Sequence, residues 1–486
     1  MSIRGFGTRS SFGVRGIRVL VDGVPLTMPD GQTEMDGLDM SLVERVEVIR
    51  GPSSTIHGNA AGGVLSIKIR QPGDTPRSQL EITGGDLCYR RARAETSGTV
   101  GSLGELLAVS GTSLEGHRPQ GTAEANNLTG KLRWQSMRGT LAATLHAIDN
   151  RAEDPGGLLA QMREDRSHAR PQSLRFDADE WIRQQRLSLL WDGQASSDDS
   201  YQLRSYYGRR EFGNSLPLQP NGQTSYDRWF AGIGAQRIFR RKWAGLPNQL
   251  TVGMDLESQR DERSRHNNLE GGVTGALTQR QRESADSQGL FLENQLTFSD
   301  ALLLTIGLRY DSVRLRAKDR YLADGDASGG DTLDDWNYSL GLSRQIGSHH
   351  AIYARYATSF ETPTINELAN PEGGGFNSSL APAQATNREI GFKGERGGLR
   401  YEAVIYSMRI EDELVPVVDG RTFYINAGRS SRDGVELSTQ WLAGQHWRLT
   451  GAWSYNSFYF DRFENYDGNR IAGIPRQSLF AGIGYD

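Results

Sequence analysis

The stretch Arg50-Gly-Pro-Ser-Ser-Thr-Ile-His-Gly-Asn-Ala-Ala-Gly-Gly-Val-Leu-Ser-Ile67 is the most informative part of the chain. It connects two short apolar segments, residues 43–49 and 64–69, whose composition predicts β-strands. Between them, Gly58 and residues 60–63 carry almost no side chain. Such a run suits a backbone that passes close to other backbone, where a Cβ atom would not fit. We therefore expect a strand, a tight crossing and a second strand.

The composition excludes several classes of protein. A chain of 486 residues with a net charge of -4 shows no electrostatic footprint for nucleic acid. The one cysteine, Cys88, cannot build an intrachain disulfide framework. No run of about 18 apolar residues is present, so a transmembrane helix is not expected. Residues 1–7 lack the basic and apolar regions of a signal peptide.

From about Arg77 onward, long segments alternate between apolar and polar residues. In residues 301–310, for example, Leu308 shares one face with the apolar residues, whereas Arg309 lies on the other. Membrane-spanning strands of about 9–11 residues show this pattern, because one face meets lipid and the other a polar interior. The same alternation recurs in residues 187–192 and 446–460. These segments therefore favour a transmembrane barrel.

We count about 18 such strands, and their connections alternate between short and long. Short turns are expected near residues 101–102, 136–139, 193–199, 299–300, 347–348, 396–398 and 443–445. Long polar loops are expected near residues 114–124, 150–179, 211–226, 259–285, 314–334, 361–385, 411–421 and 461–473. An up-and-down barrel gives this alternation when one rim is extracellular and the other periplasmic.

Two further motifs precede the opening stretch, Ile3-Arg-Gly-Phe6 and Val19-Leu-Val-Asp-Gly-Val-Pro-Leu26. In this order, the three elements resemble the plug domain of TonB-dependent outer-membrane receptors. The resemblance implies an all-β transmembrane fold: a 22-strand-type antiparallel barrel, with about 18 strands present, around a small, partial α/β plug. We expect the plug at residues 1–74 and the barrel at residues 75–486. On this interpretation the chain is an internal fragment that lacks the TonB-recruiting segment and the closing strands.

The resemblance also implies location, mechanism and partners. Such a receptor lies in the outer membrane of a Gram-negative cell, against lipid and lipopolysaccharide, and we expect a monomer with no nucleic-acid partner. It would bind a scarce, anionic small molecule on the extracellular side. TonB, powered by the inner-membrane proton gradient, would then remodel the plug. An enzyme is not expected, because no Gly-x-Ser-x-Gly or His-Glu-x-x-His motif is present.

Four charged residues are candidates for a contact between plug and barrel. Arg4 and Arg50 lie in plug motifs of the family, and Glu389 and Glu436 lie in barrel motifs. The resemblance implies that these arginines pair with these glutamates and hold the plug inside the wall. Bidentate pairing would give each partly buried charge a partner with defined geometry. The alternative is that all four are solvated strand charges.

The ligand pocket is expected between plug loops and extracellular loops. By resemblance, one plug loop covers Arg9 and Phe12, and another covers Met28, Asp30 and Gln32. Cationic and amide side chains of the barrel loops could bind an anionic ligand, and the candidates are His117, Arg118, Arg210, Asn268 and Asn366. The alternative for each is a connector residue or a solvated loop residue, since pockets use few polar groups.

Longer matches point to one branch of the family. Residues 2–18, 27–32, 153–158, 360–368, 426–428 and 469–473 resemble outer-membrane receptors for pyrroloquinoline quinone. This compound is a flat ring system with three carboxylates, which arginine and aromatic side chains could bind. The alternative is a ferric siderophore, including ferric citrate, because an anionic ferric chelate would use the same groups.

One acidic loop raises the hypothesis of structural calcium. Residues 324–335 read Asp-Gly-Asp-Ala-Ser-Gly-Gly-Asp-Thr-Leu-Asp-Asp, which begins like a calcium-binding loop and places Asp335 where a bidentate glutamate is usual. Flanking helices are not expected here, and acidic glycine-rich loops are common. We therefore assign no cofactor and no metal ligand to the chain.

Overall fold

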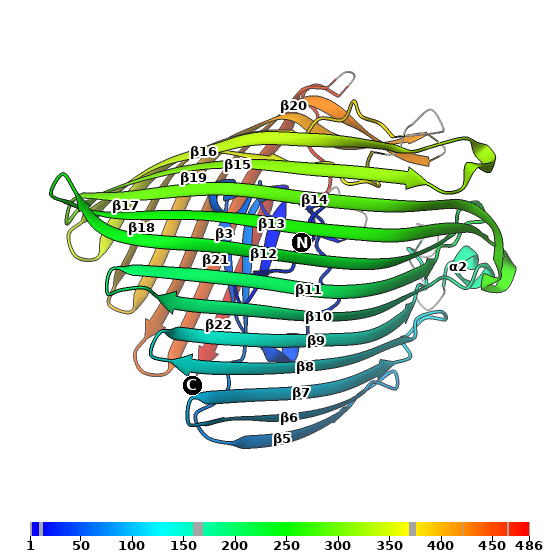
Figure 1. Ribbon diagram of the computed structural model, residues 1–486, viewed down its shortest axis with the longest axis horizontal. Coiled ribbons are helices and arrows are strands. Elements are labelled where there is room, and N and C mark those ends of the chain that lie inside the picture. Colours follow the sequence, from blue (N-terminus) through cyan, green and yellow to red (C-terminus); the bar gives the residue numbers. More distant parts are fainter. Residues whose placement is uncertain are drawn as a thin grey trace.

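The computed structural model describes residues 2–8, 13–158, 169–368, 376–419, 421–463 and 466–485 (Figure 1). A large antiparallel β-barrel surrounds a small four-stranded sheet, which we call the plug sheet. Within the described residues the barrel has 18 strands, β5 to β22, which follow one another in chain order and close into a ring. The all-β fold, with about 18 barrel strands and a small plug, is therefore confirmed.

The plug sheet has the strand order β2-β1-β4-β3. Its strands are β1 (Ile17–Val21), β2 (Val24–Pro25), β3 (Val43–Arg50) and β4 (Gly63–Ile69), accompanied by the short helices η1 (Met40–Leu42) and α1 (Ser54–His57). Strand β4 pairs parallel to β1 and antiparallel to β3. The two strands predicted around the glycine-rich stretch are confirmed to within one residue.

The glycine-rich crossing is confirmed as a place where backbone meets backbone. Gly63 has a φ of +133°, and a Cβ atom there would overlap the carbonyl oxygen of Ile49 on the neighbouring strand. A Cβ atom on Gly62 would lie 2.7 Å from the Cβ of Phe6. Glycine is the residue that accepts both the conformation and the close approach.

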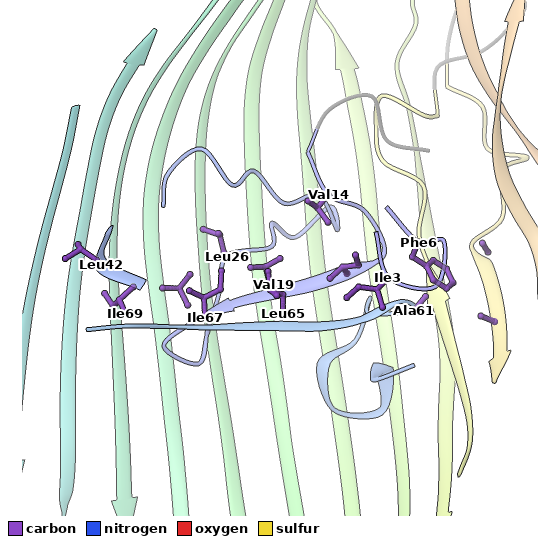
Figure 2. Close-up of a cluster of buried hydrophobic side chains, with 14 of the residues drawn as sticks. Ile3, Phe6, Val14, Val19, Leu26, Leu42, Ala61, Leu65, Ile67 and Ile69 are labelled. Carbon is purple, nitrogen blue, oxygen red and sulfur yellow. The ribbon is translucent and has the colours of Figure 1, made fainter. Parts of the chain in front are cut away.

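A hydrophobic cluster holds the plug sheet together and against the barrel wall (Figure 2). Its plug members are Ile3, Phe6, Val14, Ile17, Val19, Val21, Leu26, Leu42, Ala61, Leu65, Ile67 and Ile69. The wall contributes Leu106, Ala108, Ala383, Ala385, Met408 and Ile410. Because burial of apolar area stabilises by about 25 cal/mol per Å², these contacts fix the plug against two separate parts of the wall.

The barrel strands have the following bounds: β5 (Arg77–Gly84), β6 (Arg90–Val100), β7 (Leu103–Leu114), β8 (Ala123–Ser136), β9 (Gly139–Glu153), β10 (Asp179–Gln194), β11 (Asp199–Ser215), β12 (Gln223–Trp243), β13 (Leu246–Asn268), β14 (Thr274–Ser299), β15 (Leu302–Asp319), β16 (Gly329–Ile346), β17 (His350–Glu361), β18 (Ala383–Arg396), β19 (Leu399–Asp419), β20 (Arg421–Ala443), β21 (Trp447–Arg462) and β22 (Gln477–Tyr485). Short helices lie in the connections at α2 (Pro171–Arg175), η3 (Glu270–Gly272) and η4 (Leu322–Asp324).

The barrel exposes apolar side chains and buries polar ones. In β15, Ile306 and Leu308 are 44% and 41% exposed, whereas the neighbouring Arg309 is 3% exposed. The predicted alternation in this segment is therefore confirmed, with the apolar face outward. A strand that meets lipid on one side and a polar interior on the other requires this arrangement. No helix of the described chain is long and apolar enough to cross a membrane.

Several predicted loops are corrected by the structure. The barrel strands range from 8 to 26 residues, so many exceed the expected 9–11. Residues 259–285 and 411–421, predicted as long loops, lie mostly in the β13–β14 and β19–β20 hairpins. A strand that extends beyond the membrane needs no apolar face. Its residues can therefore be polar on both faces, and the alternation that identifies a membrane strand is absent there.

The two rims of the barrel differ. Short turns at residues 101–102, 137–138, 195–198, 244–245, 300–301, 347–349, 397–398 and 444–446 occupy one rim. The opposite rim, at the right of Figure 1 where α2 lies, carries the longer connections and the long hairpins. Short turns mark the periplasmic side of such barrels, so the opposite rim is extracellular. The domain boundary at residue 74 and the expectation of further strands stay predictions.

Candidate functional site

A cavity of about 1150 Å³ opens between the plug and the extracellular ends of β19 to β21. We call it the luminal cavity. The plug contributes residues 5–8, and the β19–β20 hairpin contributes residues 413–417, Ile425 and Arg432. Phe463, Tyr466 and residues 469–473, which follow β21, also line it, together with Glu361, Ala383, Ile410 and Phe460. The cavity therefore lies where plug and extracellular loops meet, the place predicted for a ligand pocket.

Three aromatic rings line one side of the luminal cavity. The ring centroids of Phe460 and Phe463 are 5.2 Å apart, and those of Phe463 and Tyr466 are 5.0 Å apart with nearly parallel planes. The turn that carries them is held by backbone hydrogen bonds, because Tyr466 donates to Phe463 and Gly468 donates to Phe460. A fixed stack of this kind presents ring faces against which a planar ligand group can pack.

Two arginines border the luminal cavity, and their environments differ. The guanidinium of Arg432 lies 4.5 Å from the Phe6 ring, pairs with Glu413 and donates to the carbonyl oxygen of Arg4 at 3.0 Å. Its charge is therefore compensated within the protein. Arg470 is exposed and pairs with no carboxylate in the described part of the chain. It is the cation available for an anionic ligand.

The four residues predicted to connect plug and barrel come together on the luminal side of the wall. Arg4 is buried and donates to Glu389 at 2.9 Å and to both carboxylate oxygens of Glu436 at 3.2 and 3.0 Å. Its guanidinium also lies 3.9 Å from the Tyr406 ring. Arg50 is more exposed and reaches Glu436 at 3.5 Å. We call Arg4, Arg50, Glu389 and Glu436 the plug clamp.

The electrostatics of the plug clamp keep Arg4 charged. Burial alone would lower the pKa of Arg4, but the hydrogen bonds and charges of Glu436 and Glu389 outweigh it and raise that pKa above its usual value. Gly51 leaves room for this guanidinium, since a Cβ atom there would lie 2.7 Å from Nη1 of Arg4. Arg4 is therefore a permanent cation whose carboxylate partners belong to the barrel.

Further polar contacts join the plug to other parts of the wall. Three ion pairs and one hydrogen bond cross from plug to wall: Arg18–Glu257 at 2.7 Å, Asp22–Lys131 at 2.8 Å, Asp36–Arg210 at 2.6 Å, and the Ile56 carbonyl, which accepts from Arg309 at 3.0 Å. Near this last contact, burial and the positive charges of Arg204, Arg18 and Arg309 lower the pKa of His57 to about 3. His57 is therefore neutral among these arginines.

The structure places several predicted ligand residues in plug–wall contacts. Met28 is buried with Val24, Tyr206 and Phe230 in an apolar cluster. The Asp30 side chain is also buried and accepts from the backbone N–H of Gln32 at 3.0 Å. Arg210, 1% exposed, donates to Asp36, Gln184 and Tyr226. The partners of these side chains are protein groups.

The four remaining described candidates of the barrel lie toward the extracellular rim. Asn268 is fully buried and donates to the carbonyl oxygens of Phe176 and Leu216. Arg118 donates to the carbonyl oxygens of Pro155 and Gly156, whereas His117 and Asn366 are exposed. Arg9 and Phe12 lie outside the described residues. None of the eight described candidates lines the luminal cavity, so their predicted ligand roles stay predictions.

Sequence reasoning missed the residues that dominate the luminal cavity, Phe463, Tyr466, Arg432 and Arg470. A signal was present, because five aromatic residues fall within positions 458–466, across the end of the predicted strand at residues 446–460 and the start of the predicted loop at residues 461–473. A solvated loop has no need for so many large rings. The spacing of Arg432 from Glu413 carries no comparable signal, since the two meet only across the β19–β20 hairpin.

The acidic segment behind the calcium hypothesis lies partly in a strand. Residues 329–335 belong to β16, where successive side chains alternate between the two faces of the sheet. The carboxylate of Asp319 instead accepts from the backbone N–H groups of Tyr321 and Ala327. Among the described residues, no three histidine, cysteine, aspartate or glutamate side chains stand together in a way that could hold a metal ion.

Comparison with protein families matches both parts of the molecule. Residues 1–64 match the TonB-dependent receptor plug domain, and residues 116–486 match the TonB-dependent receptor-like β-barrel. The chain is similar to the ferric enterobactin receptor of Pseudomonas aeruginosa, with 25% identity over 99% of this chain and 72% of that receptor. It is also similar to the vitamin B12 transporter of Vibrio vulnificus, with 22% identity over 90% of this chain and 64% of that transporter.

Solved structures show the same fold. The unliganded ferric citrate transporter FecA superposes with a TM-score of 0.82 at 17% identity, over 99% of this chain and 76% of that one. The ferric yersiniabactin uptake receptor FyuA from Yersinia pestis gives the same TM-score, identity and coverage. These relatives are receptors and transporters and not enzymes, and the family resides in the Gram-negative outer membrane, where it acts with TonB. The chain, with a barrel match over most of its length, belongs to the TonB-dependent receptor family.

Proposed function

We propose that this receptor binds an anionic ferric siderophore in the luminal cavity and imports it with energy delivered through TonB. The stack of Phe460, Phe463 and Tyr466 beside the uncompensated Arg470 carries this proposal. Planar rings of a siderophore would pack on the aromatic faces, and the negative charge of the chelate would face the guanidinium. The names of the relatives, which include receptors for ferric enterobactin and ferric yersiniabactin, support the same ligand class.

The cavity also offers a route by which ligand binding would reach the plug. Arg432 lines the cavity, lies over the Phe6 ring and donates to the backbone of Arg4. Arg4 is the central cation of the plug clamp. A ligand that displaces Arg432 would therefore disturb the residue that pairs with both wall glutamates, Glu389 and Glu436.

Pyrroloquinoline quinone is the second candidate, because the motifs that resemble its receptors remain in the sequence. It is flat and anionic, so the same stack and the same arginine would suit it. None of the relatives described above is named for this ligand. Arg9 and Phe12 follow Thr8, which lines the cavity, and we keep them as proposed ligand residues for either compound.

A binding titration tests this proposal. The receptor, produced from its own gene and purified in detergent, would be titrated with a ferric tris-catecholate, ferric citrate and pyrroloquinoline quinone, with tryptophan fluorescence as readout. We expect saturable binding of a ferric chelate, weakened roughly three- to tenfold by Tyr466→Ala, because a stacked pair contributes about 0.5–1.5 kcal/mol. Arg470→Gln should weaken it by about tenfold or more.

The matched control is Arg400→Gln, since Arg400 is an exposed arginine that pairs with Glu395 near the short-turn rim. It should leave binding unchanged. Tight binding of the quinone without binding of any ferric chelate would contradict the siderophore assignment and favour the second candidate. Ferric-chelate binding that is indifferent to both cavity substitutions would contradict the assigned pocket.

A further inference from the structure

The outer face of the barrel is hollowed over strands β16 to β21. The hollow has a volume of about 780 Å³ and is lined mainly by apolar side chains, among them Leu340, Leu342, Ile390 and Ile405. These four are 46–66% exposed, so they face the surroundings of the barrel and not its lumen. The small outward residues Ala354, Ser407 and Ser457 lie between the larger ones and leave the space open.

A row of polar and aromatic groups crosses the hollow on its extracellular side. The strand register aligns Tyr356, Arg388, Ser407, Asp433 and Ser457 on neighbouring strands. The guanidinium of Arg388 lies 6.0 Å from the Tyr356 ring. Because β18 begins at the extracellular rim, Arg388 lies closer to the cell exterior than Ile390. This row therefore stands where the apolar band gives way to the headgroup region.

Two outward arginines on these strands have no carboxylate partner among the described residues. Arg388 and Arg409, the latter two residues beyond Ser407 on the next strand, form no hydrogen bond or ion pair with the described side chains. Three other outward arginines near the extracellular rim do have carboxylate partners, and the pairs are Arg183–Asp149, Arg260–Asp286 and Arg282–Glu262. Asp433 is the one outward carboxylate in the lining, and two strand spacings, about 10 Å, separate it from Arg388.

We propose that this hollow is a binding site for a lipid A molecule of the outer leaflet. An acyl chain fills the apolar hollow, and a phosphate group pairs with Arg388 and Arg409, for which guanidinium geometry is well suited. Ser407, Ser457 and Asp433 are placed to hydrogen-bond the sugar hydroxyl groups beside that phosphate. The inference depends on the location in the outer membrane and is independent of the transported ligand.

Retention of lipid A by the purified receptor tests the site. The receptor in detergent would be incubated with bisphosphorylated lipid A, with dephosphorylated lipid A or with phosphatidylglycerol, and bound lipid would be counted by native mass spectrometry. We expect retention of bisphosphorylated lipid A, reduced roughly tenfold or more in the double variant Arg388→Gln/Arg409→Gln. The matched double variant Arg183→Gln/Arg260→Gln should retain it, because those arginines already have carboxylate partners.

A second variant tests the acyl-chain part of the site separately. Ser407→Trp would fill the hollow and leave both arginines in place, and we expect it to lower lipid A retention as well. Equal retention of phosphatidylglycerol and lipid A by the unmodified receptor would overturn the proposal in favour of general anionic-lipid binding. Retention of lipid A that is unaffected by the arginine double variant would overturn it outright.

Discussion

Single glycines shape the plug by leaving space where other groups approach closely. Gly63 combines a left-handed φ with an approach to Ile49 that excludes any Cβ atom, and Gly51 makes room for the guanidinium of Arg4. Neither glycine contributes an attractive contact of its own. Each allows a contact between other groups, and this is why the glycine-rich stretch carries so much information about the fold.

Gly63→Val should disrupt the plug while leaving the barrel intact. The new side chain would overlap the backbone of β3 and force a strained φ, so we expect loss of the β3–β4 pairing. Limited proteolysis should then cleave the plug, whereas the barrel should keep its heat-modifiable migration on gels. Gly157→Ala is the control, because a Cβ atom there meets nothing within 4 Å. A protease-resistant plug in Gly63→Val would contradict this account.

At the same scale, sequence reasoning found the plug clamp but not the cavity residues. Arg4 and Glu436 lie in motifs that can be recognised from the sequence alone. The role of Arg210 depends on where the plug loop with Asp36 meets β11, which the sequence pattern does not specify. Met28 similarly becomes a core residue only because Tyr206 and Phe230 of the barrel wall pack against it.

At the scale of elements, a strand could be predicted from the sequence where it contacts lipid but not where it extends into water. Strand β15 could be predicted because the membrane selects an apolar residue at every second position. The outer parts of β13 and β14 could not be predicted, because in water both faces of a hairpin tolerate polar residues. The plug sheet was predictable for a further reason, since its strands flank a stretch that only glycine and alanine can occupy.

The contact between the plug and the barrel is also a property of elements. We propose that the plug clamp holds the plug in place, and Glu389→Gln with Glu436→Gln tests this by leaving Arg4 buried without a carboxylate. Removing the partner of a buried charge typically costs about 3–5 kcal/mol, so we expect the plug to unfold at lower denaturant concentration. Cells producing this variant should also become more permeable to large antibiotics that intact outer membranes exclude.

The exposed pair Arg400–Glu395 supplies the control for the clamp experiment. Both side chains are more than half exposed, and such pairs contribute at most about 1 kcal/mol. Glu395→Gln should therefore change neither plug stability nor permeability. If the double clamp variant behaved like this control, the clamp would be a passive contact and the plug would be held by its apolar cluster alone.

At the scale of the whole molecule, the barrel, the plug and the luminal cavity have different roles. The barrel supplies a lipid-facing wall, the plug closes its lumen, and the luminal cavity lies between the plug and the extracellular hairpins. Arg432 connects the plug to the luminal cavity, since it borders the cavity and donates a hydrogen bond to the backbone of Arg4 in the plug. This arrangement suits a transporter in which a ligand bound on the extracellular side and energy delivered by TonB from the periplasmic side act on the same plug.

The most direct test of this account is the energy dependence of uptake. Cells that express the receptor from its own gene would be given a ferric siderophore labelled with radioactive iron, with TonB present or deleted. We predict surface binding in both strains but accumulation of iron only where TonB is present. Accumulation at the same rate without TonB would contradict the central claim, because the chain would then act as a passive pore.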